Sequence, residues 1–534
     1  MMSSVFILGA GLMQRPAIEA AHRLGYKAVV ADGSPKAPCA VLADTFVHID
    51  LKDRDALYAY ALSIKDELEA VFTAGTDFSA SVSYVAERLG LKSHPFEAAL
   101  NASDKIRMRR AFAEHGVPSP VFCEITSDEW NVCVAETGAG HHAAQKLLEN
   151  AGFADFPLVI KPVDNMGGRG CRMINDAAEL SDAVSEALKY SRSDRAVLED
   201  YMNGPEFSID ALVFNGEVTI TGFADRHIYF PPYFIEMGHT MSTDIGHDDW
   251  NALVSCFASG IKALGLTHGV AKADIKLTPR GPMIGEIAAR LSGGYMSGWT
   301  YPYASDFFLT EQALLLALGK EPREIMQKRV PTDIPGIYDV PCVRTSAERA
   351  WLSIPGRIKD VLGLEDAAQS ASIRDVLPRV SAGDTITFPV NNVGKCGNVI
   401  SVADTREAAV AAAEKAISSI IVRLEKDNAE TDAFLSSPLS TAYPPSAYQL
   451  GTDVYAEIDA IASDARLTLS ADSVPALLKG FEDCADWNKR TVKQALSAIH
   501  AVCGDCSVPE KKFVCALVRG GIQGALYVID TEVR

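Results

Sequence analysis

Two carboxylates and an arginine stand out in the otherwise apolar stretch from Gly265 to Gly294. Asp274 lies in the run VAKADIKL, and Glu286 and Arg290 lie in GPMIGEIAAR, after the turn signal Pro279-Arg280-Gly281. A hairpin here would set Asp274 beside Glu286. Because unpaired carboxylates are costly to bury, we expect these to bind something charged. A hard cation such as magnesium, bridging them to nucleotide phosphates, would explain them, and a structural salt bridge from Arg290 to either acid would explain them equally well.

The composition is that of a soluble protein with several domains. The chain has 534 residues, of which 48% are hydrophobic and 22% charged. Its formal net charge of -19 argues against a surface built mainly to hold nucleic acid or an anionic membrane. A local basic pocket is compatible with this total.

The compartment follows from the cysteines and from the apolar runs. The opening MMSSVFILGAGLMQRP is short, glycine-rich and without a basic leading segment, unlike a signal peptide. No stretch approaches the apolar length needed to span a bilayer. Eleven cysteines, scattered through apolar segments, look like reduced core thiols. We therefore expect a cytoplasmic protein that neither enters a membrane nor binds nucleic acid.

The first hundred residues predict a small parallel sheet. An apolar strand, Ser4 to Gly9, turns through Gly9-Ala10-Gly11 into a helix, and a second strand ends at Asp32. This is a unit of Rossmann type. Gln14 stands where the third glycine of G-x-G-x-x-G belongs, so a dinucleotide and a dehydrogenase receive little support. Asp32 could hold a ribose or cap the next turn.

A basic helix and a glycine-rich loop follow. NASDKIRMRRAFAEHGVPSP predicts a helix that begins at Ser103 or Asp104, with most of its five basic residues on a solvated face. PLVIKPVDNMGGRGCRMI then predicts a strand bearing Lys161, the loop Asn165 to Gly170, and a second strand. Glycines allow backbone NH groups to approach a polyphosphate, and a lysine supplies countercharge. No GK[ST] follows, so a hairpin lid fits better than a Walker loop.

Two glutamates extend this pattern. Glu199 ends the apolar run AVLEDY, where it or its neighbouring backbone could meet an adenine amino group. Glu206, after Gly204, is placed to hold ribose hydroxyls. Each glutamate alone favours a surface role, but together with Lys161 and its loop they predict a nucleotide clamp.

These motifs, in this order, resemble the ATP-grasp superfamily. DKIRMRRAFAEHGVPSP, PLVIKPVDNMGGRG, VLEDYMNGPEFSIDALV, ADIKL and IGEIAARLSGG are most similar to its carboxylate-amine ligases of the L-amino acid ligase type, over roughly residues 1–425. The resemblance implies an ADP-forming enzyme whose ATP lies between two α+β subdomains.

The resemblance also implies roles for individual residues. Arg290 and Lys161 would be catalytic, and Asp274 and Glu286 would hold Mg²⁺ or Mn²⁺. Many members carry an asparagine two residues after the second acid, where this chain has Ala288, which leaves the number of metal sites open. The residues implied to contact ATP are Lys105, Lys161, Met166, Gly167, Gly168, Arg169, Gly170, Glu199, Tyr201, Met202 and Glu206.

The substrate residues carry a weaker signal. DRHIYFPPYFIEMGHTMSTD corresponds to a loop over the substrate pocket in related ligases, so Glu236 could receive an amine and His239 could assist. A packed loop with a capping histidine is the alternative, favoured slightly for His239. Gly293 and Gly294 would wall the same pocket, and a substrate carboxylate could lie on Arg290.

The fold class expected is α/β and α+β, in several domains. We expect a Rossmann-like pre-ATP-grasp domain (1–100), an ATP-grasp core (101–335), a small C-terminal ligase domain (336–425), a linker (426–450) and an unrecognised α+β tail (451–534). In the tail, Lys512 to Val518 and Gly524 to Asp530 read as strands. Cys503 and Cys506, in a C-x-x-C, could form a metal site with Cys484 and Cys515, but core or surface thiols fit the irregular spacing better.

The leading hypothesis is an ATP- and magnesium-dependent ligase that joins a small-molecule carboxylate to an amine, plausibly an amino acid to an amino acid. The alternatives are an ATP-grasp enzyme of purine biosynthesis or of biotin-carboxylase type, and a non-catalytic ATP-binding regulatory protein. Self-association into a homodimer is compatible with each of these.

Overall fold

The structure is a computed structural model that describes residues 3–153, 155–471 and 473–532. The chain divides into two compact units. Unit 1 comprises Met1–His227 and His239–Ser346, and unit 2 comprises Ile228–Gly238 and Ala347–Arg534. The predicted five-part division is not tested by this split and stays a prediction.

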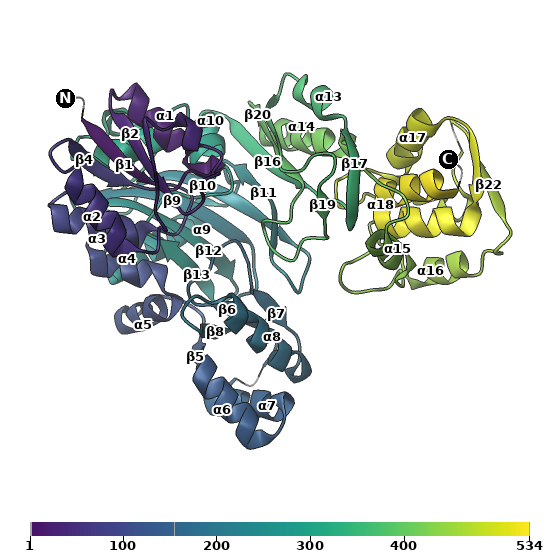
Figure 1. Cartoon of the computed structure of the whole chain (residues 1–534), viewed down its shortest axis with the longest axis horizontal. Helices are drawn as coiled ribbons and strands as arrows, with labels where there is room; N and C mark the ends of the chain where they lie inside the picture. Colours follow the sequence, from purple (N-terminus) through teal and green to yellow (C-terminus); the bar gives the residue numbers. More distant parts are fainter. Residues whose placement is uncertain (1–2, 154, 472, 533–534) are drawn as a thin grey trace. The chain divides into compact units, whose positions relative to one another are not determined.

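Unit 1 begins with the predicted parallel sheet, with strand order β3-β2-β1-β4 (Figure 1). Its core is apolar on both faces, as expected for parallel strands covered by helices. The elements are β1 (Ser4–Leu8), η1 (Leu12–Gln14), α1 (Arg15–Arg23), β2 (Lys27–Asp32), η2 (Ala40–Leu42), β3 (Thr45–His48), α2 (Arg54–Ser63), β4 (Leu68–Phe72), α3 (Ser79–Leu89) and α4 (Phe96–Ser103).

A four-stranded antiparallel sheet, β5-β8-β6-β7, forms a small subdomain of unit 1 together with three helices (Figure 1). Leu180, Val184 and Leu188 recur along one face of α8 and pack against the sheet. The elements are β5 (Phe122–Thr126), α6 (Ser127–Thr137), α7 (Gly140–Ala151), β6 (Leu158–Pro162), β7 (Arg172–Ile174), α8 (Ala177–Tyr190) and β8 (Arg195–Asp200).

The larger sheet runs in the order β13-β12-β9-β10-β11, and helices α5 and α9 pack on one face. Helix α5 begins after the Asp104 cap and ends at Gly116, whose φ is 67°, as the sequence predicted. The elements are α5 (Lys105–His115), β9 (Glu206–Phe214), β10 (Glu217–Tyr229), β11 (Ile235–Met241), α9 (His247–Leu264), β12 (Gly269–Thr278), β13 (Gly281–Ala288), η3 (Met296–Thr300), α10 (Tyr301–Ser305), α11 (Leu309–Ala317), α12 (Arg323–Lys328), β14 (Val330–Pro331) and β15 (Ile337–Asp339).

Unit 2 combines short strands with helices. Helix α14 ends at Ser419, because the β-branched run from Ile421 forms a strand. The elements are β16 (Thr345–Trp351), β17 (Gly356–Leu362), α13 (Leu364–Ala368), β18 (Ile373–Pro378), β19 (Thr385–Ile386), β20 (Gly397–Ala403), α14 (Arg406–Ser419), β21 (Ile421–Leu424), α15 (Ala429–Ser436), α16 (Thr452–Asp459), β22 (Arg466–Leu469), η4 (Ala476–Leu478), α17 (Val492–Cys503), β23 (Cys506–Pro509) and α18 (Glu510–Glu532).

Helix α18 replaces the two strands predicted for the tail, and that prediction is wrong. The apolar runs are buried on nearly all sides, so they lack the stripe that marks a surface helix. Gly521, between the two predicted strands, is a kink inside the helix with a φ of 62°. Among the described residues α18 alone is long and apolar enough to cross a membrane, and 94% of its apolar window is buried in the fold, as in the core helix of a folded domain.

Candidate active site

The β12–β13 hairpin places the two predicted metal ligands side by side. Asp274 lies directly opposite Glu286 in the antiparallel register, so this prediction is confirmed. After this pair the register shifts, and Ile275 faces Ile284. Gly285 is therefore the extra residue of a bulge, which lets its carbonyl group accept a hydrogen bond from outside the sheet.

Charged side chains line one face of the sheet around this pair. On β9 and β12, Lys276 is in register with Glu206, and Lys272 with Asp210. Since alternate residues of a strand share a face, these residues and Asp274 lie on one surface. The charged residues of this surface are Glu206, Asp210, Arg226, Lys272, Asp274, Lys276 and Glu286.

Asp274 is already neutralised by cations that the sequence analysis missed. Arg226 Nη1 lies 2.7 Å from Asp274 Oδ1 and 2.5 Å from Glu206 Oε1. Lys272 also pairs with Asp274. The alternation in AKADIKL, with Lys272 and Lys276 two residues either side of Asp274, was the signal that could have revealed these lysines. A metal ion bound to Asp274 would share the carboxylate with these cations.

Lys105 stands beside the second acid. Its Nζ is 3.6 Å from Glu286 Oε2, and it donates a hydrogen bond of 3.2 Å to the Asn165 carbonyl oxygen. Burial by itself lowers the pKa of this lysine, but the carboxylates of Glu286 and Asp77 outweigh it and raise the pKa. A buried, charged lysine at the start of α5 therefore faces Glu286.

Glu199 holds two cations in the core. Lys161 Nζ lies 2.6 Å from Glu199 Oε2, and Arg109 Nε lies 2.7 Å from Glu199 Oε1. Burial would raise the pKa of Glu199, but Arg109 and Lys161 bring it below its ordinary value. Arg109 also donates through Nη2 to the Gly285 carbonyl at 2.6 Å. Arg109 is fully buried, although most of the basic residues of this helix were expected on a solvated face.

The loop from Met166 to Gly170 has the backbone freedom that the sequence predicted. Gly167, Gly168 and Gly170 have φ values of 69°, 75° and 69°, which favour glycine. The Asn165 side chain accepts the Met166 NH at 2.9 Å, which fixes the entry to the loop. Successive NH groups in such a turn form an anion-binding concavity.

Lys276 contacts the backbone that follows Glu199. Lys276 Nζ donates to the Met202 carbonyl oxygen at 3.2 Å and lies 4.8 Å from the centre of the Tyr201 ring. It also lies 3.3 Å from Glu206 Oε2. Three of the residues predicted to surround the adenine and ribose, Tyr201, Met202 and Glu206, therefore lie around Lys276. The fourth, Glu199, pairs with Lys161 instead.

Arg290 makes neither of the salt bridges considered from the sequence. Its Nε and Nη2 donate to Asp77 Oδ1 at 2.8 and 2.6 Å. Burial alone lowers the pKa of Arg290, but Asp77 outweighs it and raises the pKa. Asp77 follows β4, so the ion pair links the N-terminal sheet to the segment after β13, where Ala74 also forms a bridge with Leu291.

Hydrogen bonds to Asp210 hold the segment after Arg290 in place. Asp210 Oδ2 accepts the Ser292 NH at 3.0 Å and its hydroxyl at 2.8 Å. Burial raises the pKa of Asp210 to about 6. A Cβ on Gly293 would lie 3.4 Å from the Gly75 carbonyl oxygen, and Gly294 has a φ of 60°. Both predicted glycines therefore stand where the backbone is closely packed or left-handed.

Glu236 and His239 fall in different units. In unit 2, Glu236 Oε1 lies 3.8 Å from Lys395 Nζ, and the Glu236 carbonyl accepts a hydrogen bond from Lys395 at 2.7 Å. In unit 1, His239 is fully buried. Their substrate roles stay predictions.

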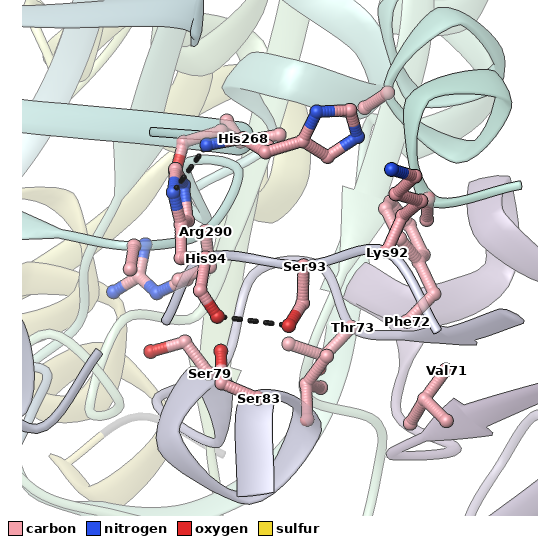
Figure 2. A pocket seen from close by; sticks show the side chains of 16 residues that line it. Val71, Phe72, Thr73, Ser79, Ser83, Lys92, Ser93, His94, His268 and Arg290 are labelled. Atoms are coloured by element: carbon pink, nitrogen blue, oxygen red, sulfur yellow. Dashed lines mark hydrogen bonds between the residues drawn. The ribbon is translucent and has the colours of Figure 1, made fainter. Parts of the chain in front are cut away.

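A small cavity of about 50 Å³ lies behind Arg290 (Figure 2). His94 borders it and is a satisfied core residue, since Nε2 donates to the Val270 carbonyl at 2.9 Å and Nδ1 accepts the His268 NH at 3.1 Å. Burial lowers the pKa of His94 to about 4, so the ring is neutral. Figure 2 shows Ser79 and Ser83 on the neighbouring helix. The cavity has room for water but not for a substrate.

The N-terminal glycine turn is closed to a dinucleotide. A Cβ on Gly9 would lie 2.9 Å from the Gln14 side chain, which fills the turn and accepts the Gly11 NH at 2.9 Å. Asp32 accepts the NH groups of Ala10 and Ser34, each at 2.8 Å, which is the capping role considered for it.

The Asp274 and Glu286 pair is the metal site predicted from the sequence. In residues 3–153, 155–471 and 473–532 no group of three or more His, Cys, Asp or Glu side chains is placed to hold a metal ion. The metal site considered for the cysteines of the tail is therefore not formed. Asp274 and Glu286 fit a hard cation that takes its remaining ligands from phosphate or water.

Family comparisons agree with this geometry. Residues 154–298 match the ATP-grasp domain, residues 350–425 match the L-amino acid ligase C-terminal domain 2, and residues 2–76 match the ribonucleotide synthetase preATP-grasp domain. The solved structure of an L-amino acid ligase from Bacillus licheniformis is 20% identical, with a TM-score of 0.65, and covers 80% of this chain and 100% of that chain.

Two curated relatives are similar in sequence. The uncharacterized protein y4rH of Sinorhizobium fredii is 24% identical over 416 residues, which is 76% of this chain and 80% of that protein. Carnosine synthase 1 of Gallus gallus is 26% identical over 346 residues, which is 60% of this chain and 35% of that protein. The chain thus spans only about a third of the synthase. The chain therefore contains, in this order, a preATP-grasp domain, an ATP-grasp domain and an L-amino acid ligase C-terminal domain 2.

Proposed function

We propose that this chain is an ATP-dependent carboxylate-amine ligase. It activates a small-molecule carboxylate as an acyl phosphate and joins it to an amine, releasing ADP and phosphate. The observation that carries the proposal is the in-register pair Asp274 and Glu286, with Lys105 Nζ 3.6 Å from Glu286. The similarity to carnosine synthase 1 and the ligase-type C-terminal domain support amide-bond formation.

Asp274 and Glu286 would hold Mg²⁺ or Mn²⁺. The ion, when bound, supplies positive charge between the nucleotide phosphates. Because the protein offers two carboxylates here and Ala288 offers no donor oxygen, phosphate and water would complete the coordination.

The protein's own task is positioning and charge neutralisation, since phosphoryl transfer asks little covalent chemistry of it. Lys161, held by Glu199, and Lys105 would neutralise the phosphates, and NH groups of the Met166 to Gly170 loop would close over them. Arg290, held by Asp77, would steady the transferred phosphoryl group and then the acyl phosphate. These cations are preorganised because each already has a carboxylate partner within 3.6 Å.

The nucleotide base would lie along the backbone of Tyr201 and Met202, and Glu206 would receive the ribose hydroxyls. The Glu199 side chain contributes indirectly, because both of its oxygens are taken by Arg109 and Lys161. We place the activity in the cytoplasm, since no disulfide joins any of the eleven cysteines, all of which lie among the described residues.

The test is phosphate release from ATP and magnesium, with the whole chain, against a panel of single and paired amino acids, other carboxylates and bicarbonate. We expect release that requires a carboxylate and an amine, stops with EDTA, and falls at least about a hundredfold in Glu286→Gln while ADP binding persists. Glu114→Gln, an exposed acid on α5, is the matched control and should keep full activity.

Other outcomes separate the alternatives. Release with bicarbonate alone would favour a carboxylase. ATP binding without release on any panel member would favour the regulatory protein, and no ATP binding at all would refute the proposal.

A further inference from the structure

A second, larger cavity of about 310 Å³ opens in unit 1 beside the Glu286 and Lys105 pair. Its size is that of a small-molecule site. Asp77 and Ala288 also border it, so the cavity begins at the reacting end of the proposed active site. Its described walls include Lys105 but neither Lys161 nor any of the residues predicted to hold adenine and ribose, so the proposed positions of the base and the ribose lie outside this cavity.

Three cations line this cavity without a carboxylate partner. Among the ion pairs of the described residues, none involves Lys52, Arg54 or Arg192. Arg54 lies over the Phe96 ring at 5.4 Å, and Arg192 over the Phe78 ring at 5.9 Å. Each is thus held by an aromatic ring while its charge stays uncompensated. Burial lowers the pKa of Arg54, against the nearby Tyr84 hydroxyl.

The two acids next to these cations in sequence form hydrogen bonds with other groups. Asp53, between Lys52 and Arg54 in sequence, caps α2 by accepting the Ala56 NH at 2.9 Å. Asp55 accepts the Tyr84 hydroxyl. Neither is therefore a countercharge for the cavity.

Three carboxylates do line the cavity. Asp77 is paired with Arg290 at 2.6 Å, and Glu286 with Lys105 at 3.6 Å. Asp164 Oδ1 accepts the Ser191 hydroxyl at 3.2 Å and the Arg192 NH at 3.0 Å. The excess charge facing the cavity is therefore positive, although the whole chain carries a formal charge of -19.

The N-terminus of helix α3 adds to the positive charge that faces the cavity. Residues 78–81 line the cavity, and the Phe78 cap position provides no side-chain hydrogen bond. The first turn of the helix contains no acidic residue. Free NH groups and the helix dipole at such an end favour an anion.

We propose that this cavity holds the carboxylate substrate of the ligase, and that this substrate carries a second anionic group bound by Lys52, Arg54 and Arg192. The substrate class is then a dicarboxylic amino acid or a phosphorylated carboxylic acid. The reacting carboxylate lies at the Glu286 and Arg290 end, and the second anion lies at the basic end. This inference rests on the proposed function and adds the charge of the substrate to it.

Binding is measured directly, so that the result is independent of turnover. Isothermal titration of the whole chain with magnesium and ADP compares L-glutamate with L-glutamine, L-aspartate with L-asparagine, and O-phospho-L-serine with L-serine. We expect at least one acidic compound to bind about tenfold more tightly than its neutral partner, the worth of one charge-assisted hydrogen bond. The phosphoserine pair distinguishes phosphate from carboxylate.

Two double variants test the residues. Arg54→Gln with Arg192→Gln should reduce the preference for the acidic compound to less than about threefold, and should leave binding of the neutral partner and of ADP unchanged. Lys65→Gln with Lys189→Gln makes the same charge change at exposed residues that do not line the cavity, and should keep the preference.

Equal binding of all acidic and neutral partners, or no measurable binding of any acidic compound, would overturn the proposal. So would an equal loss in the control double variant, since distant charge would then explain the preference. If phosphate release proceeds with neutral carboxylates in those cases, the proposed ligase function stands. If the acidic preference is found but no substrate gives phosphate release, the cavity assignment stands and the ligase function fails.

Discussion

Arg109→Met is expected to destabilise unit 1 strongly, although no contact with ATP or substrate is proposed for Arg109. The guanidinium is fully buried and joins Glu199 at 2.7 Å to the Gly285 carbonyl at 2.6 Å. Methionine fills a similar volume without charge or donors. The variant therefore leaves the buried Glu199 carboxylate with Lys161 alone and the Gly285 carbonyl without its donor.

The size of the effect follows from burial. Removing one partner of a buried ion pair costs about 3 to 5 kcal/mol, because the other charge stays in the core. In a domain of this size each kcal/mol lowers Tm by roughly 2 °C, so the transition of unit 1 should shift down by about 6 to 10 °C. Differential scanning calorimetry of the whole chain measures this shift.

The adjacent residue supplies a matched control. Arg110 also pairs with a glutamate at 2.7 Å, but the side chains of Arg110 and Glu124 are 62% and 25% exposed. Arg110→Met should therefore cost at most about 1 kcal/mol. The double variant Arg109→Met with Glu199→Gln should lose less stability than the two single losses added together, because no uncompensated carboxylate remains. Equal Tm shifts for Arg109→Met and Arg110→Met would refute the reasoning.

Two further predictions concern the proposed active site. The folded pKa of Asp210, about 6, lies above its unfolded value, so the folded state binds the extra proton and stability falls as pH rises through this window. Asp210→Asn keeps an acceptor for Ser292 and should raise stability by up to ~3 kcal/mol at pH 8 and much less at pH 4; equal Tm changes at both pH values would contradict this. Gly170→Ala would bring a Cβ within 2.9 Å of Tyr190, whereas Gly167→Ala, with the same φ of 69°, meets no atom within 4 Å. Gly170→Ala should therefore weaken ADP binding and lower Tm more than Gly167→Ala does, in titration and calorimetry, and the reverse order would be inconsistent with the packing.

Local sequence patterns predicted the hairpin, the glycine loop and helix α5. The turn signal and the two-residue alternation around Asp274 specify a register that sets this acid opposite Glu286, and the structure has that register. The same alternation places Lys272 and Lys276 on the face of Asp274, but it does not show which carboxylates they pair with. Such features can be predicted because neighbouring residues along the chain decide them.

Local patterns failed where apolar runs had no clear period. Helix α18 was predicted as two strands because a helix buried on nearly all sides carries no amphipathic stripe. Its helical state depends on the packing of unit 2 around it.

The sequence by itself determined the order of the three matched domains and the chemical types of the candidate-site residues, since these are recorded in motifs of adjacent residues. The tertiary structure alone decided which charges meet. Arg290 pairs with Asp77 at a separation of 213 residues, and Arg109 reaches Glu199 across 90 and Gly285 across 176. No periodicity links residues so far apart, because their contact arises only when the separate sheets pack. The same packing brings Lys52, Arg54 and Arg192 around one cavity.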